Sequence, residues 1–423
     1  MVYYGLLYKV KGIWGNSNMF EIPKFLGDDE YLQNPMMRRF LKDRGLELVE
    51  TKADYIKAIE EYANRNVANG REVKQWLTKT IKEGSKDFCY RKLKSGEDIY
   101  KNLATISGKL NVDFPDCPKV EVLDYRHTSG KTLINYDIIT NENDEVVRVD
   151  FIYSRSFLCG EIGKEGKQVI FPLFIEIYLE QGFVVSRGKA KSTLFEYNED
   201  ATDLILRTET KVDAMSYAIS TIDNLLHLLE IEVETDTKRV KSENSQVLYK
   251  IYNRYSFTPE DVVEKVNRED KLTNQFIDTL FTNLVLDIKN KPMAIMDARI
   301  LIEKFISING NNEDVFKEDR VAYLIKVSAD NDIELTKSDT MSDKNVPLQC
   351  TEAFFDSKKT VIKSKSCKRL HLIFKRENAK YFLKKNPLVV QLGTHKNCAY
   401  IKTMQYAEEA DIQNVLQAIF ESY

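Results

Sequence analysis

The order of hydrophobic and polar residues predicts helices early in the chain, then strands, then helices, then strands again. In residues 34–110 apolar side chains recur at the spacing of amphipathic helices, with runs at 35–43 and 51–65. A third helical run extends over "REVKQWLTKTIKEGSKDFCYRKLKSG", between Gly70 and Gly96. Two prolines in "NVDFPDCPK" (111–119) mark a boundary after these helices.

Short apolar runs separated by turn residues follow, and they are typical of an antiparallel sheet. These predicted strands are "KVEVLDY", "TLINYDIIT", "VVRVDFIYS", "QVIFPLFIEIYLE", "GFVVSRGKA", "STLFEY" and "DLILRTET". The pattern becomes largely helical over 211–320. The last hundred residues return to strands, in "AYLIKVSA", "KTVIKS", "RLHLIFK", "PLVVQLGT" and "CAYIKTMQY", and a helix in "EEADIQNVLQAIFESY" closes the chain.

These patterns predict an α+β fold of five consecutive segments. They are a β-prone N-terminal segment (1–30), a helical module (31–115), an antiparallel β domain (116–210), a helical section (211–320) and a basic β domain with a C-terminal helix (321–423).

Composition narrows the class of protein. Hydrophobic residues make up 43% of the 423 residues, which excludes global disorder, and the net charge of −3 argues against a wholly basic coat protein. The six cysteines show no ligand-like spacing, so reduced thiols are expected. No signal peptide or membrane-length apolar run is evident, which predicts a cytoplasmic protein without a membrane partner, nucleoid-associated if it binds DNA. Abundant Lys, Asn and Ile suggest an AT-rich bacterial or phage genome.

The segment "FLKDRGLELVETKADYIKAIEEY" (40–62) predicts a helix, an extended loop and a second helix. Gly45 can adopt a positive φ and end the first helix. Thr51 is a natural N-cap for the second helix, and Asp54 stands three residues later as an acidic capping-box variant.

This segment resembles the SAP domain, a short helix–loop–helix module of DNA-associated proteins. The matching places are Met37-Arg38, Leu41, Arg44-Gly45-Leu46, Lys52 and Ala53-Asp54-Tyr55-Ile56, within about 30 of the 423 residues. The family usually has glycine where this chain has Glu50. The resemblance implies DNA contact through the loop and the start of the second helix, and roles in chromatin organisation, repair or replication of mobile elements. Six basic and six acidic residues over 36–64 leave the module neutral.

Two further segments are strongly basic. Residues 70–95 carry eight Lys or Arg against three acids, interleaved with Trp76 and Tyr90, and 357–387 carries eleven against Glu377 alone. The second segment predicts a β-hairpin with one cationic face, although either segment could be merely a solvated surface. The candidate nucleic-acid-binding residues are Arg38, Arg44, Lys52, Lys74, Lys79, Lys82, Arg91, Lys92, Lys363, Lys365, Lys368, Arg369, Lys375 and Arg376.

Catalytic patterns are weak. "HTSGKT" (127–132) has Tyr125 where a phosphate-binding loop needs glycine, and it lies between strands. Asp150 and Glu176 lie on strands, as in a metal-dependent nuclease, but "FIEIYLEQ" lacks the required lysine. The four histidines form no metal-binding pair, and His227 in "LLHLLE" is interpreted as a helix-core residue.

The sequence therefore predicts a non-catalytic protein that binds duplex DNA, mainly through phosphates, without catalytic residues, metal or other cofactor. An alternative is a protein-interaction subunit of a phage-defence, segregation or mobile-element complex. A weaker alternative is a metal-dependent nuclease with a degenerate motif.

Overall fold

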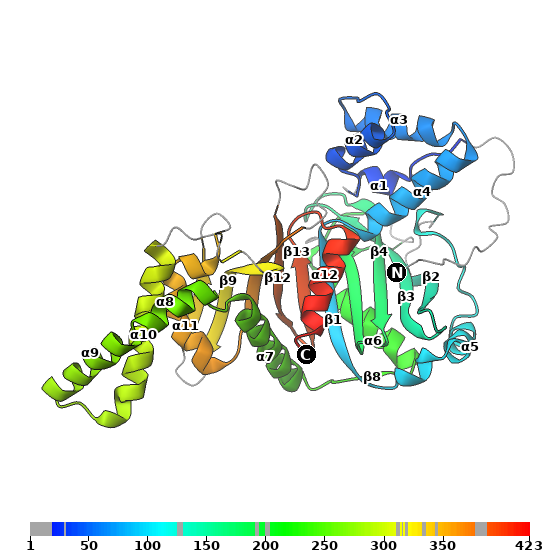
Figure 1. Cartoon of the computed structure of the whole chain (residues 1–423). Helices are drawn as coiled ribbons and strands as arrows, with labels where there is room; N and C mark the ends of the chain where they lie inside the picture. The colour runs from blue at the N-terminus through cyan, green and yellow to red at the C-terminus, as the bar shows by residue number, and fades with distance from the viewer. Residues whose placement is uncertain are drawn as a thin grey trace. The chain divides into compact units, whose positions relative to one another are not determined.

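Two compact units make up the chain: unit 1 ends at Ile81 and unit 2 begins at Lys82. The computed structural model describes residues 19–28, 31–124, 130–190, 194–198, 204–309, 314, 316–317, 320–331, 336–342, 346–376 and 387–423 (Figure 1). Helices and a large antiparallel sheet confirm the α+β class. Most of the β-prone segment predicted for 1–30 lies outside the described residues. Within the described ranges, no helix is both long and apolar enough to cross a membrane.

Unit 1 is helical, with α1 (Lys24–Asp28), α2 (Asn34–Asp43), α3 (Lys52–Ala63) and α4 (Val67–Lys82), whose last residue starts unit 2. The buried stripe of α2 is Met36, Met37, Phe40 and Leu41, at the spacing that the sequence predicted. Gly45 follows α2 with φ of +64°.

The helix predicted between Gly70 and Gly96 is wrong in its second half. α4 ends at Lys82, and residues 86–95 form strand β1 (Lys86–Ser95). Gly84 lies between them with φ of +104°, a conformation that favours glycine and breaks the helix. Phe88 and Tyr90 then point to one face of a sheet and Cys89 to the other, since side chains alternate along a strand.

One antiparallel sheet dominates unit 2. Along its main path the strand order is β10-β9-β11-β12-β13-β1-β5-β4-β3-β6-β7, while β2 pairs with β3 and β8 with β1. The remaining strands are β2 (Thr132–Thr140), β3 (Val146–Cys159), β4 (Lys167–Tyr178), β5 (Phe183–Lys189), β6 (Leu194–Glu196), β7 (Lys211–Val212), β8 (Glu232–Val233), β9 (Ala322–Asn331), β10 (Thr336–Met341), β11 (Arg369–Phe374), β12 (Leu388–His395) and β13 (Cys398–Thr403).

Helices cover both faces of this sheet. The helices of unit 2 that follow β1 are α5 (Leu103–Asp113), α6 (Ala214–Leu228), α7 (Thr237–Tyr255), α8 (Glu260–Arg268), α9 (Asp270–Asn283), α10 (Lys291–Asn309), α11 (Glu352–Ser364) and α12 (Glu409–Phe420), with 3-10 turns η1 (Asp98–Lys101), η2 (Val122–Asp124), η3 (Thr208–Thr210), η4 (Ile288–Asn290) and η5 (Leu348–Cys350). Apolar residues of α7, α11 and α12 pack on one face with Phe88 and Tyr90. Residues of α5 and α6 pack on the other with Cys89.

Strand β1 joins the two groups of strands that the sequence pattern assigned to separate β domains. It pairs with β13 on one side and with β5 on the other. The strands of 116–210 and of 321–423 therefore belong to one sheet. The alternation of apolar residues predicts that a strand exists, but it does not reveal the strand's partners.

Three predicted strands differ in the structure. "KTVIKS" is part of helix α11, where Phe354, Phe355 and Val361 are buried on one side of the helix. In their described residues, "KVEVLDY" contains the turn η2, and "DLILRTET" contributes an isolated bridge at Ile205 and the turn η3. The basic β-hairpin predicted within 357–387 is therefore wrong: its first half is the end of α11, and its second strand, β11, pairs with β9 and with β12, which begins at Leu388.

Candidate functional site

Arg44, a candidate DNA contact, is engaged within unit 1. It lies 3.5 Å from the centre of the Phe40 ring, donates a 2.9 Å hydrogen bond to the Phe40 carbonyl and pairs with Glu72. Glu72 also accepts a 2.7 Å hydrogen bond from the Tyr62 hydroxyl. Arg44 therefore fastens the end of α2 to α3 and α4 and has few donors left for a phosphate.

Lys52 is also used inside unit 1, because its Nζ donates a 2.6 Å hydrogen bond to the Gly27 carbonyl. Thr51 caps α3 as predicted, accepting from the Asp54 amide at 3.2 Å. Arg38 is exposed on α2, so it is the candidate of the SAP-like segment that faces solvent.

Helix α4 presents a polar ridge in unit 1. Arg71, Gln75 and Lys79 are all exposed and follow one another at four-residue steps, so they share one face of the helix. Lys74 is half-buried beside this ridge. Two of the predicted contacts, Lys74 and Lys79, thus lie on or next to a surface that a phosphate could reach.

Three candidates in unit 2 are engaged in its interior. Arg91 is almost fully buried, pairs with Asp223 and donates to the Glu234 carbonyl at 2.9 Å. Arg376 pairs with Asp411 at 3.1 Å and donates to the Tyr406 carbonyl at 2.7 Å. Lys82 belongs to a network of buried charges described below. All three make contacts within unit 2 and are not presented on its surface as phosphate contacts.

The other candidates of unit 2 are accessible. Lys92, Lys363, Lys365, Arg369 and Lys375 are exposed, and Lys368 is half-buried. Four of them lie within seven residues, from the end of α11 to the first residue of β11. Backbone hydrogen bonds from Cys367 to Ser245 (3.0 Å) and from Lys368 to Ser328 (2.8 Å) hold this segment against α7 and β9.

A fifth cation joins this group. Lys241 of α7 is exposed. The pKa of Lys368 is lowered mainly by its own partial burial and further by the positive charge of Lys241. We name Lys241, Lys363, Lys365, Lys368 and Arg369 the corner cluster, because α7, α11, β9 and β11 meet there. Crowded like charges disfavour one another, so an arriving polyanion would be favoured at this corner.

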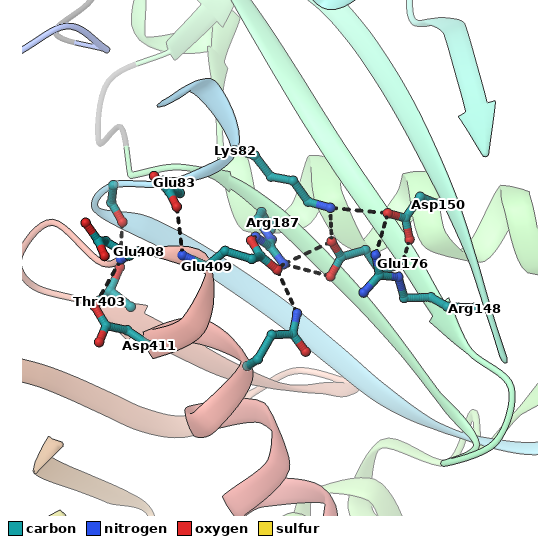
Figure 2. A network of polar contacts seen from close by, with 12 residues as sticks. Lys82, Glu83, Arg148, Asp150, Glu176, Arg187, Thr403, Glu408, Glu409 and Asp411 are labelled. Atoms are coloured by element: carbon teal, nitrogen blue, oxygen red, sulfur yellow. Dashed lines mark hydrogen bonds and ion pairs between the residues drawn. The ribbon is translucent and has the colours of Figure 1, made fainter. Parts of the chain in front are cut away.

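A second charged group lies over β3, β4 and β5, with Lys82 pointing into it (Figure 2). Asp150 of β3 stands directly opposite Glu176 of β4 in the sheet register. Lys82 Nζ lies 2.7 Å from Glu176 Oε1 and 3.2 Å from Asp150 Oδ2. Arg148 Nε is 2.7 Å from Asp150 Oδ1, and Arg187 Nη1 is 2.5 Å from Glu409 Oε2 at the start of α12.

The carboxylates of this network titrate differently. Burial opposes ionisation of Glu176, but Arg187 and Lys82 hold the pKa of this carboxyl far below its usual value. Burial instead raises the pKa of Asp150, and the neighbouring Glu176 charge adds to that effect. Burial likewise disfavours the charged form of Lys82, yet the two carboxylates raise its pKa above the usual value.

The network bears on the nuclease alternative. The lysine missing from the β4 sequence is present in space as Lys82, which comes from the end of α4. The cations Lys82, Arg148 and Arg187 match the anions Asp150, Glu176 and Glu409 in number, and each carboxylate is paired with at least one of them. A metal ion would have to compete with these cations for the carboxylate oxygens, which favours a structural role.

Polar contacts continue from the network to the N-terminus of α12. Glu83 accepts hydrogen bonds of 2.9 Å from the Glu409 amide and from the Tyr406 hydroxyl. Glu408 and Asp411 form a capping box, as Figure 2 shows beside Glu83. These carboxylates suit the positive end of a helix dipole, and they tie α12 to the sheet.

Residues 127–129 of "HTSGKT" (127–132) lie outside the described residues, and β2 begins at Thr132. His227 lies on α6 as expected but is exposed, so its interpretation as a core residue is wrong: the buried face of α6 passes through Ile222, Leu225 and Leu226. No group of three or more His, Cys, Asp or Glu side chains among the described residues could hold a metal ion.

Sequence reasoning found the exposed cations of the corner cluster from their concentration in 357–387, but it missed Lys241. That lysine is 122 positions before Lys363 in the chain and has no local signal. Comparison of the chain with protein-family models, with curated proteins and with solved structures found no match.

Proposed function

We propose that the chain binds nucleic acid without catalysis, mainly through phosphates, and that the corner cluster is its principal contact in unit 2. The observation that carries the proposal is the gathering of five accessible cations where α7, α11, β9 and β11 meet, in a chain whose net charge is −3. Duplex DNA presents closely spaced negative charges, and clustered Lys and Arg gain affinity by releasing its counterions.

Unit 1 offers a second contact surface. Its SAP-like segment resembles DNA-associated modules and presents Arg38, while α4 presents the ridge of Arg71, Gln75 and Lys79. Because Arg44 and Lys52 are engaged within the unit, this surface contributes through Arg38 and α4. Contacts of this kind position a protein on the backbone without reading the bases.

The test is a gel-shift titration of duplex DNA with the variant Lys363→Gln, Lys365→Gln, Lys368→Gln, Arg369→Gln. We expect loss of the retarded band at concentrations where the unchanged protein retains the DNA. The matched control is Lys265→Gln, Arg268→Gln, Lys271→Gln, Lys289→Gln, which removes three lysines and one arginine from exposed positions elsewhere in unit 2.

Equal binding by the two variants would reject the corner cluster as the contact. Failure of the unchanged protein to bind at low salt would favour the protein-interaction alternative instead. Nicking of plasmid DNA on addition of magnesium or manganese would favour the nuclease.

A further inference from the structure

Helices α9 and α10 form a helical hairpin (270–309) that extends from the part of unit 2 that holds the sheet (Figure 1). The helices are antiparallel neighbours joined by residues 284–290. The buried residues of α9 are Thr273 and Ile277, and that of α10 is Ser307. Helices in a globular unit normally bury a whole apolar stripe, so this hairpin leaves much of its apolar surface without a partner.

Large apolar residues are concentrated on the hairpin surface. The exposed ones are Leu272, Phe276, Leu284, Val285, Leu286, Ile288, Met293, Met296, Leu301 and Phe305. Each of these ten side chains exposes on the order of 100 Å² of its area, so together they expose roughly 1,000 Å². A monomer's largest apolar patch is typically about 300–600 Å².

The main apolar residues of the two helices share one face. Leu272 and Phe276 are four residues apart on α9, and Leu301 and Phe305 are four apart on α10, so each pair forms a stripe. Ion pairs join the two helices on one side of their seam: Lys291 with Asp278, and Arg299 with Asp270. Helical periodicity in an antiparallel pair places both apolar stripes on the other side of that seam.

The tip of the hairpin carries an unusual residue. Val285 follows α9 with φ of +52° and a relative exposure of 90%. The Leu286 amide donates to the Phe281 carbonyl at 3.0 Å, which is the hydrogen bond of a Schellman helix end. That position favours glycine, and a β-branched residue there is strained. A strained and exposed apolar side chain indicates that the side chain itself is needed at the tip.

The charges of the hairpin select an apolar and neutral partner. Residues 270–309 contain five acidic residues (Asp270, Asp278, Asp287, Asp297, Glu303) and five basic ones (Lys271, Lys289, Lys291, Arg299, Lys304). Most of them are paired within the chain, as Lys359 with Asp297 and Lys358 with Glu303, at 2.9 and 2.6 Å. Neither a polyanion nor a strongly charged protein would be attracted, and two copies would not repel each other.

We infer that the occupant of this surface is a second copy of the chain, with two hairpins packed as a four-helix bundle about a two-fold axis. In such an interface the same patch serves both subunits, and two helices from each copy complete the bundle. The available apolar surface compares with the roughly 800 Å² per partner of a stable interface. This inference is independent of the proposed nucleic-acid binding.

The test is sedimentation velocity of the full chain over a concentration series, with three variants. The unchanged protein is expected to sediment as a dimer. Phe276→Glu with Leu301→Glu is expected to raise the dimer dissociation constant at least about 100-fold, because buried central residues dominate interface energies. The matched control, Val112→Glu with Ile99→Glu, changes exposed apolar residues of α5 and η1 and is expected to leave the dimer intact.

Val285→Gly separates the tip contact from folding. Relief of the strained φ is expected to raise the unfolding temperature of the chain, while loss of the side chain weakens the dimer at least about threefold. A monomeric unchanged protein would overturn the inference, and so would a dimer that the hairpin variants leave unchanged. Flotation of the monomer with neutral phosphatidylcholine vesicles would assign the surface to a membrane instead and would equally overturn it.

Discussion

Arg187 Nη2 lies 2.8 Å from Glu176 Oε2, and the two side chains are 0% and 1% exposed. They come from neighbouring strands, β5 and β4, on the face of the sheet where α12 begins. An intact buried ion pair adds little net stability, because both charges lose their hydration. Removing one partner is costly, because the other charge stays buried without a counterion. The pair therefore fixes α12 on the sheet more than it adds net stability.

Removal of one partner from this pair should be costly. Arg187→Leu leaves Glu176 buried with Lys82 as its remaining close cation, and we expect the free energy of unfolding to fall by about 3–5 kcal/mol. Urea unfolding followed by circular dichroism measures the change. The control Arg239→Leu breaks an exposed pair with Glu243, and it should change the free energy of unfolding far less, because water screens exposed ion pairs. Equal effects of the two variants would contradict the structural role of the network.

Acid should weaken the same network. The pKa of Glu176 is lowered in the folded state, so its contribution is fully present above the unfolded value of about 4.3. It is lost as pH falls from there toward the folded pKa. Asp150 has a raised pKa in the folded state, so its own contribution to stability increases as pH falls. We expect Glu176→Gln to be less stable than the unchanged protein at neutral pH, and the difference to shrink below about pH 5. If the difference in unfolding free energy between the two proteins stayed constant from pH 7 to pH 3, this assignment would be refuted.

Helix α3 depends on its cap. The Thr51 side chain accepts from the Asp54 amide at 3.2 Å, and Thr51→Ala should lower the stability of unit 1 by about 1 kcal/mol. Amide hydrogen exchange in the first turn of α3 measures it. Thr51→Ser retains the hydroxyl and should restore the protection. Unchanged exchange in the alanine variant would show that the cap contributes nothing.

Local signals predicted several elements well. The stripe at Met36, Met37, Phe40 and Leu41, with Gly45 after it, marks α2 because helix ends and apolar spacing are encoded within a few residues. β1 was missed because "KDFCYRKLK" is strongly charged, yet it lies in the middle of the sheet. Its long cations reach partners far along the chain, as Arg91 reaches Asp223.

The network could not be predicted for a similar reason. Lys82, Asp150 and Glu176 come from the end of a helix and two strands, and register alone brings the two carboxylates together. Charge counts find basic segments, but they cannot separate an exposed cation from a paired one. Arg44, Lys82, Arg91 and Arg376 were predicted as contacts for that reason, and the structure engages them internally.

Two adjacent residues allow a cation on the surface to be compared with one that is paired in the interior. Lys375 is exposed, whereas Arg376 is almost fully buried and pairs with Asp411. Lys375→Gln should weaken DNA binding slightly and leave the unfolding temperature unchanged. Arg376→Gln should lower the unfolding free energy by about 1–3 kcal/mol, because it leaves Asp411 without its cation. Thermal unfolding and gel shift on both variants measure these effects, and a reversed order would contradict the placement of the two side chains.

The salt dependence of DNA binding by the corner cluster is the decisive measurement. If Lys241, Lys363, Lys365, Lys368 and Arg369 meet three to five phosphates, the logarithm of the binding constant should fall with the logarithm of salt concentration at a slope of roughly −3 to −4.5. The four-residue glutamine variant of the cluster should reduce that slope by about 3, while the matched control keeps it. An unchanged slope in the cluster variant, or no binding by the unchanged protein at low salt, would contradict phosphate binding at this corner.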